Sequence, residues 1–338
     1  MLRKPQIWIG FIVSAVALYL AFRGIEWDQL GSALRGAQYG YLIPSALALI
    51  AAIAVRAERW RWLFGERRST LPLERTFSAL TIGYLVTNTL PLRVGEIARA
   101  LFVSRGGKVT IAHAASSIVV EHVLDVLIVL GILVLMLPLL PLPDWAAQSA
   151  TVSAAIFGAA LVFMLIVVWQ RVRVERWGEQ ILDRIPRLNT QRWLRNLIHV
   201  LDGFAVLQPG RPLIAIVGWA IAGWMLSALT IHFALMAFIP NPSLVISLFV
   251  TVTTTFSLLL PATPGGLGVM QGAIVLSLAV FNIPQAPALS FAIVFHLMEY
   301  IVMDILGAIS LWREAGSWAS MKAQFRSVTS VAVEGQIK

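Results

Sequence analysis

Long continuous apolar runs constrain the fold of this chain more than any other feature. Several of them, such as residues 152–169 and 213–238, approach or exceed the ~20 residues that a helix needs to cross a bilayer. Hydrophobic residues make up 58% of the chain and charged residues 13%, whereas a soluble domain has about 25% charged residues. Because the runs are continuous and do not alternate, the sequence predicts an all-α polytopic membrane protein and not a barrel.

The first apolar run, residues 7–22, follows Arg3 and Lys4 as the core of a signal peptide does. No small-residue cleavage site accompanies it, so we expect a retained first helix. The chain has no cysteine, which excludes disulfides, thiolate metal sites and cysteine nucleophiles. We attribute the net charge of +9 to membrane orientation and not to nucleic-acid binding.

An elaborate break at residues 261–272 interrupts an apolar run that extends from 244 to 281. Two prolines remove backbone donors, and four glycines permit backbone geometries that other residues resist. In hydrocarbon, such a break persists only where protein or a water-filled cavity satisfies the freed polar groups. The break predicts a pocket or pathway; the alternative is a Pro/Gly turn at the membrane surface.

A second break, at residues 87–99, carries charges. The apolar run before it, residues 77–90, would cover about 21 Å at ~1.5 Å per residue, less than the ~30 Å hydrocarbon core. If the basic segments at 56–75, 171–211 and 313 are all cytoplasmic, region 73–104 must begin and end inside, and region 244–281 must begin and end outside.

The charge distribution therefore predicts six full transmembrane helices and two oppositely oriented re-entrant helical hairpins, an inverted repeat. The alternative is eight simple spans. Residues 1–313 would form a single transmembrane domain with a cytoplasmic basic segment at 170–211, and 314–338 a polar cytoplasmic tail. A helix at about 41–55 would end at a tryptophan- and arginine-rich membrane boundary, residues 56–62.

Ionisable residues at bilayer depth are costly, so each is a candidate functional group. Glu121 and Asp125 lie one helical turn apart in the run 112–139, and His296 and Glu299 lie at comparable depth in the last helix. Arg93 and Arg99 are the expected counter-ions. They would either neutralise the acids structurally or bind an anionic phosphate head group. Glu96 is expected to be a structural partner.

Motifs of catalysis are missing from the sequence. Its five histidines show no metal-binding spacing, and the glycines at 265–268 neither follow a strand nor precede a GK[ST] element. We therefore expect no enzyme activity, no catalytic residue, no metal and no cofactor.

The chain resembles the flippase-like membrane domain family that includes the transmembrane region of lysylphosphatidylglycerol synthases. The resemblance covers nearly the whole chain. It is carried by residues 57–61, residues 91–96 with Arg99, Glu121 with Asp125, and residues 264–268. This chain departs from the family pattern at His122, where arginine is usual, at Gln271, where glutamate is usual, and at His296, where arginine is usual.

The resemblance implies a multi-pass protein of the cytoplasmic (inner) membrane of a prokaryote, with both termini cytoplasmic, that translocates or handles an anionic, isoprenoid or polyprenyl-phosphate-linked lipid. No acyltransferase-type domain follows, so aminoacyl transfer is not expected. The alternatives are a component of membrane glycosylation that uses lipid-linked sugars, or a scaffold of an envelope-building complex; homo-oligomers or envelope-biosynthesis partners fit either. The expected substrate-binding residues are Arg93, Glu96, Arg99, Glu121, His122, Asp125, Pro264, Gly265, Gly266, Gly268, Gln271, His296 and Glu299.

Overall fold

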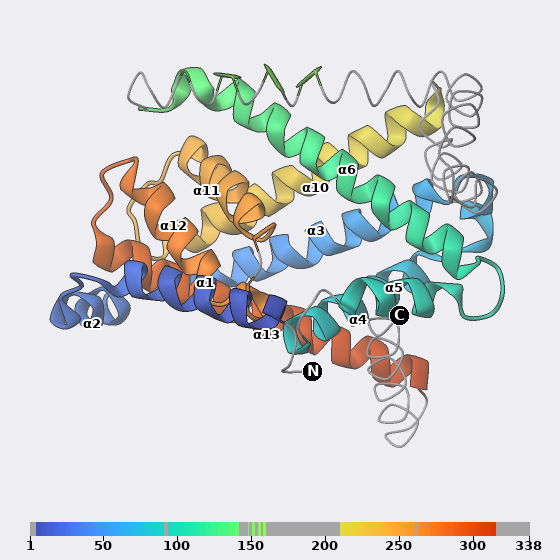
Figure 1. The fold of residues 1–338 in the computed structure, drawn as a ribbon, viewed down its shortest axis with the longest axis horizontal. Helices are drawn as coiled ribbons and strands as arrows, with labels where there is room; N and C mark the ends of the chain where they lie inside the picture. The colour runs from blue at the N-terminus through green and yellow to red at the C-terminus, as the bar shows by residue number, and fades with distance from the viewer. Residues whose placement is uncertain are drawn as a thin grey trace, which may run out of the picture.

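The computed structural model describes residues 5–90, 94–141, 210–260 and 262–315, with a few single positions between 148 and 159. Within these ranges every regular element is helical (Figure 1). The predictions for residue 93, for residues 170–209 and for the tail beyond 315 concern segments outside this description. The helices are α1 (Pro5–Phe22), α2 (Trp27–Arg35), α3 (Leu42–Leu63), α4 (Leu73–Thr89), α5 (Val94–Ser104), α6 (Ile111–Met136), α10 (Arg211–Met236), α11 (Leu244–Ser257), α12 (Val269–Ala279) and α13 (Gln285–Ala315).

Four stretches are long and apolar enough to cross a membrane: Tyr39–Leu63, Ile111–Leu139, Arg211–Met236 and Gln285–Glu314. A fifth stretch is obtained if α1 and α2 are counted together, although they meet at a bend of 86°. The all-helical, polytopic character predicted from the apolar runs is therefore confirmed for the described residues. Short 3-10 turns, η2 (Gly65–Thr70) after α3 and η5 (Pro264–Gly266) before α12, occupy two of the connections.

Two pairs of short helices are inserted between the long ones. Helices α4 and α5 have 17 and 11 residues, and α11 and α12 have 14 and 11. In Figure 1, α4 starts at the end of the molecule where α3 finishes, and α5 returns to that end to meet α6; α11 and α12 do the same at the opposite end. Both breaks predicted from prolines and glycines thus lie where two short helices pair with one another.

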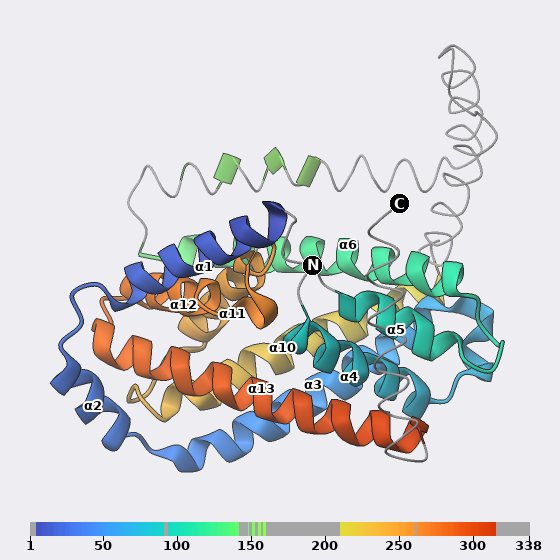
Figure 2. The same ribbon diagram turned by 60° about the horizontal axis from the view of Figure 1, so that its bottom comes forward.

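The helix contacts of one half recur in the other. The pair α3–α4 corresponds to α10–α11, α5–α6 to α12–α13, and, across the halves, α4–α13 to α6–α11. Helices α3 and α10 pack along one another at the centre, where the two halves meet (Figure 2). The described helices therefore form two matched units with the same internal packing.

One helix boundary differs from the sequence prediction. The expected helix at 41–55 continues to Leu63, so the arginines and tryptophans of residues 56–62 lie on α3 itself. Arg59 is 1% exposed and Trp60 is fully buried, so neither side chain faces lipid or solvent. The helix continues because its last two turns are buried by α5 and α6, as described next.

Candidate functional site

A buried ion cluster joins α3 to α6. Glu121 and Asp125 lie one helical turn apart on α6, and Arg59 of α3 bonds to both carboxylates. The Arg59 Nη2 atom lies 2.9 Å from Glu121 Oε1 and 2.9 Å from Asp125 Oδ2. Arg59 and Glu121 are nearly inaccessible to solvent. Charge-assisted bonds of this kind offset the cost of removing the groups from water.

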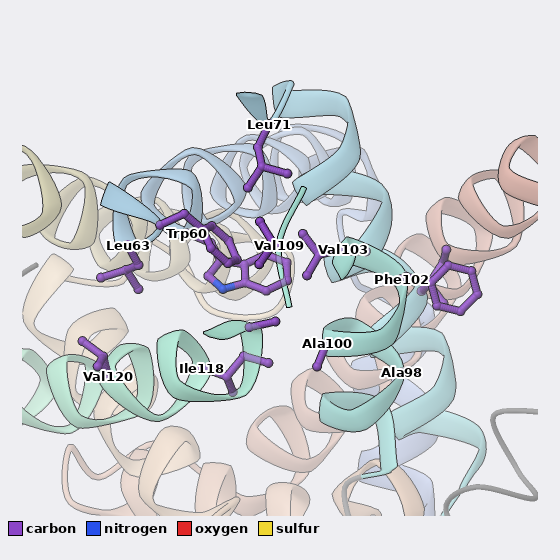
Figure 3. Packing of buried hydrophobic residues seen from close by; sticks show 14 of the residues in the cluster. Trp60, Leu63, Leu71, Ala98, Ala100, Phe102, Val103, Val109, Ile118 and Val120 are labelled. Atoms are coloured by element: carbon purple, nitrogen blue, oxygen red, sulfur yellow. The ribbon is translucent and has the colours of Figure 1, made fainter. Parts of the chain in front are cut away.

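The α5 helix adds a second arginine to the same carboxylate. Arg99 pairs with Glu121 Oε2, and its guanidinium carbon lies 3.8 Å from the centre of the Trp60 ring. Trp60 Nε1 in turn donates to Ser117 Oγ at 2.9 Å. Figure 3 shows the indole among Val103, Val109 and Ile118. Arg99 is therefore held between a carboxylate and an aromatic face, and both contacts favour the cation.

One edge of the cluster is accessible. Glu96 Oε2 lies 3.7 Å from Arg99 Nη1, and Glu96 Oε1 lies 3.3 Å from His122 Nε2. The side chains of Glu96 and His122 are 36% and 47% exposed, whereas that of Arg99 is only 5% exposed. An anion approaching Arg99 from this edge would meet Glu96 and His122 first.

Arg56 links the cluster to the second half of the molecule. Trp224 of α10 donates from Nε1 to Asp125 Oδ1 at 3.0 Å, and the Arg56 guanidinium carbon lies 5.1 Å from the centre of the Trp224 ring. Arg56 Nη2 also donates to Ser227 Oγ at 3.0 Å. The charge of Arg56 attracts both Asp125 and the half-buried Glu299 of α13.

A second, uncharged network lies at the Pro/Gly turn between α11 and α12. Gln271 accepts a hydrogen bond from the Gly268 N–H at 2.7 Å, and its Nε2 lies 2.8 Å from His296 Nδ1. His296 Nε2 lies 3.1 Å from the Gly265 carbonyl oxygen. Because the amide nitrogen must donate to Nδ1, the network assigns the His296 proton to Nε2. Every polar atom of this chain of bonds then has a partner.

Close packing holds the same turn. Gly265 has φ of +66°, and a Cβ there would lie 1.3 Å from the Tyr300 hydroxyl oxygen. That hydroxyl donates to the Pro264 carbonyl oxygen at 3.2 Å. Ser14 of α1 makes two hydrogen bonds to Thr263. Its Oγ accepts from the Thr263 N–H at 3.0 Å and donates to Thr263 Oγ1. The turn is therefore enclosed by α1, α13 and the adjoining α4, and is not a free surface loop.

The structure thus divides the expected site residues between two places. Glu96, Arg99, Glu121, His122 and Asp125 form the ion cluster, and the turn residues Pro264, Gly265, Gly266 and Gly268 lie with Gln271 and His296 at the second network. Glu299 lies on α13 and is partly buried. Arg93 and Pro261 lie outside the described residues.

Sequence reasoning missed Arg59, Arg56 and Trp224 as members of the cluster. A signal for the first two existed, since Arg56, Arg59 and Trp60 fall at i, i+3 and i+4 and so share one helix face. We interpreted them as a membrane boundary because Arg and Trp together are typical of one. Trp224 lies within the apolar run 213–238, and no charged residue beside it in the sequence indicates a polar partner.

These features define a class: a multi-pass helical membrane protein with a buried arginine–carboxylate cluster between its long helices and a short helical hairpin. The model of the family described as the lysylphosphatidylglycerol synthase TM region matches residues 7–307. The chain belongs to that family, as its motifs predicted.

Archaeal relatives support the assignment over most of the chain. A UPF0104 membrane protein of Methanothermobacter thermautotrophicus is 22% identical over 315 residues, which are 88% of this chain and 92% of that protein. A UPF0104 membrane protein of Methanocaldococcus jannaschii is 21% identical over 228 residues, 67% of this chain and 93% of that protein. The family's description connects this chain to a membrane function related to lipids.

Proposed function

We propose that this protein translocates an anionic or isoprenoid lipid, such as a polyprenyl-phosphate-linked lipid, across the cytoplasmic membrane of a prokaryote. The observation that carries the proposal is the burial of Arg59 and Arg99 against Glu121 at the packing surface of α5, α3 and α6. Ionisable groups within membrane segments are costly and mark substrate pathways. A purely structural contact between these helices could be made by apolar side chains at lower cost.

The cluster has unused capacity for an anion. The Nε atoms of Arg59 and Arg99 are both buried and have no hydrogen-bond partner in the described part of the chain, and a buried donor left unpaired is unfavourable. A lipid phosphate that entered beside Glu96 and His122 would supply acceptor oxygens and compete with Glu121 for Arg99. The substrate would then exchange with an internal carboxylate, so the arginines would not be left unpaired in either state.

The helical hairpins suit the same function. In the proposed membrane arrangement, α4–α5 and α11–α12 are re-entrant and enter from opposite faces, which is the inverted-repeat architecture that places transport sites near the midplane. The end of α3, with its basic residues, would be cytoplasmic, and so would both termini. The sequence carries no ATP-binding motif, so movement would be passive or coupled to a proton or ion.

Reconstitution tests the proposal. Purified protein is placed in vesicles with a head-group-labelled anionic phospholipid or a labelled polyprenyl phosphate, and a membrane-impermeant quencher reports the label that reaches the outer leaflet. We expect faster exchange than in protein-free vesicles and a loss of at least tenfold in Arg99→Gln. Arg313→Gln, which alters only an exposed pair with Glu74, is the matched control. Exchange at the protein-free rate for every head group would contradict the proposal.

A further inference from the structure

A cavity separate from the ion cluster lies at the end of the molecule where α3 finishes and α10 begins. Its volume is about 310 Å³, and its walls come from Arg61, Trp62 and the η2 segment, with Pro212 at the start of α10. Small-molecule sites have volumes of about 300–1,000 Å³. The cavity therefore has room for a head group but not for a whole lipid. Arg61 lies two residues beyond Arg59, about 200° around the helix, so the two arginines serve different sites.

Two arginines of the cavity walls share a single carboxylate. Arg61 and Arg68 both bond to the single carboxylate of Glu58, at 2.5 Å and 2.9 Å. Glu66 also lines the cavity but is exposed, and the exposed Arg67 follows it in the chain. The cavity walls therefore contain two arginines that share one carboxylate, and Arg67 is not among them. Neither Arg61 nor Arg68 has a carboxylate to itself, so an additional anion would be attracted.

Two hydrogen-bond donors of the cavity walls have no acceptor. Trp62 Nε1 and Arg68 Nε are buried, and neither has a hydrogen-bond partner among the described residues. The Arg68 guanidinium carbon lies 3.5 Å from the centre of the Trp62 ring, which places the two donors close together. Buried polar groups are nearly always paired, so an acceptor is missing here. Both donors lie beneath the cavity surface, and a group with several oxygens that displaced the partly exposed Arg68 side chain could accept from both. A negative charge would also favour Arg68.

We propose that this cavity binds the phosphate group of an anionic membrane lipid. It lies at the shared end of the candidate spans Tyr39–Leu63 and Arg211–Met236, the depth at which lipid head groups are found, and its tryptophan and arginine are typical of that layer. Free phosphate has the same binding chemistry, and the experiment distinguishes the two sources. The site does not depend on the proposed translocation, because it uses neither Arg99 nor Glu121.

The test measures thermal unfolding of the purified full chain in detergent at constant ionic strength. The probes are water-soluble dihexanoyl phosphatidylglycerol, dihexanoyl phosphatidylcholine and inorganic phosphate. A ligand that binds the folded state raises the unfolding temperature in a saturable way, which gives a dissociation constant. We expect phosphatidylglycerol to bind and inorganic phosphate to bind at least tenfold more weakly.

Three variants locate the binding. Arg68→Gln removes the cation and one free donor, and we expect a loss of affinity of about tenfold or more. Trp62→Phe keeps the ring beneath Arg68 but removes the other donor, and we expect a loss of about threefold to tenfold. Arg67→Gln is the control, because Arg67 is adjacent and exposed but does not line the cavity; its affinity should stay within twofold of the native value. If Arg68→Gln fails to fold, the affinity of Trp62→Phe still tests whether the ligand binds in this cavity.

The outcomes are distinct. Binding of phosphatidylglycerol that both variants weaken supports the proposal. Phosphate that binds as tightly, with the same dependence on Arg68 and Trp62, supports the site and assigns it to the free anion. Phosphatidylcholine that binds as tightly as phosphatidylglycerol overturns the requirement for an anion. Absence of saturable binding, or binding that neither variant alters, overturns the site.

Discussion

Glu121 is the residue on which the ion cluster depends. One of its oxygens pairs with Arg59 and the other with Arg99, so its single charge is shared between two buried cations from two different helices. Asp125 supports Arg59 as a second partner, but the described residues offer Arg99 only Glu96 in reserve, at 3.7 Å. Removing the Glu121 charge would therefore leave Arg99 less well paired than Arg59.

We predict that Glu121→Gln destabilises the protein by about 3–5 kcal/mol, the usual cost of breaking a buried ion pair on one side. The double variant Arg99→Gln with Glu121→Gln should lose less than the sum of the single variants, because it removes both charges. Thermal unfolding in detergent measures both effects. Glu74→Gln is the control, since its pair with Arg313 is exposed and worth at most about 1 kcal/mol. An unfolding temperature of Glu121→Gln equal to that of the control would contradict the assignment.

The amide of Gln271 connects the Pro/Gly turn to α13. It accepts from the Gly268 N–H and contacts His296. Gln271→Met keeps the length of the side chain but leaves these groups unpaired, which costs about 1 kcal/mol or more. The turn should then open about fivefold more often.

The chain has no cysteine, so a single Thr263→Cys can report this opening by its labelling rate. We expect Gln271→Met to raise that rate about fivefold. Gln29→Met, on the exposed surface of α2, should leave it unchanged. Equal rates in both backgrounds would show that Gln271 does not hold the turn.

At the scale of elements, small residues determine how closely the helices approach. The α4–α5 hairpin closes at Gly83 and Gly95: a Cβ on Gly95 would lie 2.0 Å from Thr87 Oγ1 and 2.1 Å from the Gly83 carbonyl oxygen. Gly307 of α13 packs against α4, where a Cβ would lie 2.6 Å from the Thr81 carbonyl oxygen. Small residues at helix contacts are characteristic of membrane proteins, which lack a hydrophobic driving force between helices.

We expect Gly95→Ala to force α4 and α5 apart, because one of the clashing atoms belongs to the backbone and cannot rotate away. Overpacking of this kind costs about 1–3 kcal/mol, or more where nothing can shift. Gly131→Ala, in α6, is the matched control: no atom lies within 4 Å of its added Cβ, and alanine favours the helix. Unfolding temperatures and the yield of monodisperse protein measure the difference, and a Gly95→Ala variant as stable as Gly131→Ala would refute the close approach.

The sequence predicted elements better than it predicted partners. Apolar runs located α6 and α10 to within a few residues, and prolines and glycines located the turn at Pro264–Gly266. The predicted end of α3 was wrong because the last turns of this helix are stabilised by partners that lie far away in the chain. Arg59 bonds to residues 62 and 66 positions further on, and no local pattern encodes that distance. Arg99 and Glu121 could be paired in advance because the sequence offers few other buried charges.

At the scale of the whole molecule, the two units match in packing but differ in charge. Glu121 on α6 bonds to Arg99 of the adjoining short helix, and His296 on α13 bonds to Gln271 of its own adjoining short helix. The corresponding contact is thus an ion pair in one half and a neutral hydrogen bond in the other. If the protein transports an anion as proposed, that anion would meet buried arginines in one unit and a neutral network in the other, as far as the described residues show.

The membrane arrangement makes a prediction about sidedness that single cysteines can test. Gly65 and Lys108 flank the α4–α5 hairpin, whereas Asn241 and Pro284 flank the α11–α12 hairpin. If both hairpins are re-entrant, cysteines at the first two positions label from the cytoplasm and cysteines at the other two label from outside.

The hairpin tips decide between re-entrant helices and full spans. If the hairpin is re-entrant, α4 ends within the bilayer, and a cysteine at Thr89, at the end of α4, should be shielded from an impermeant reagent on the outer face. The control is the cysteine at Asn241, which should react rapidly from that face. If α4 and α5 were instead two complete crossings, the cysteine at Thr89 would react as fast as the one at Asn241, and the hairpin could not bring Arg99 to a site inside the membrane.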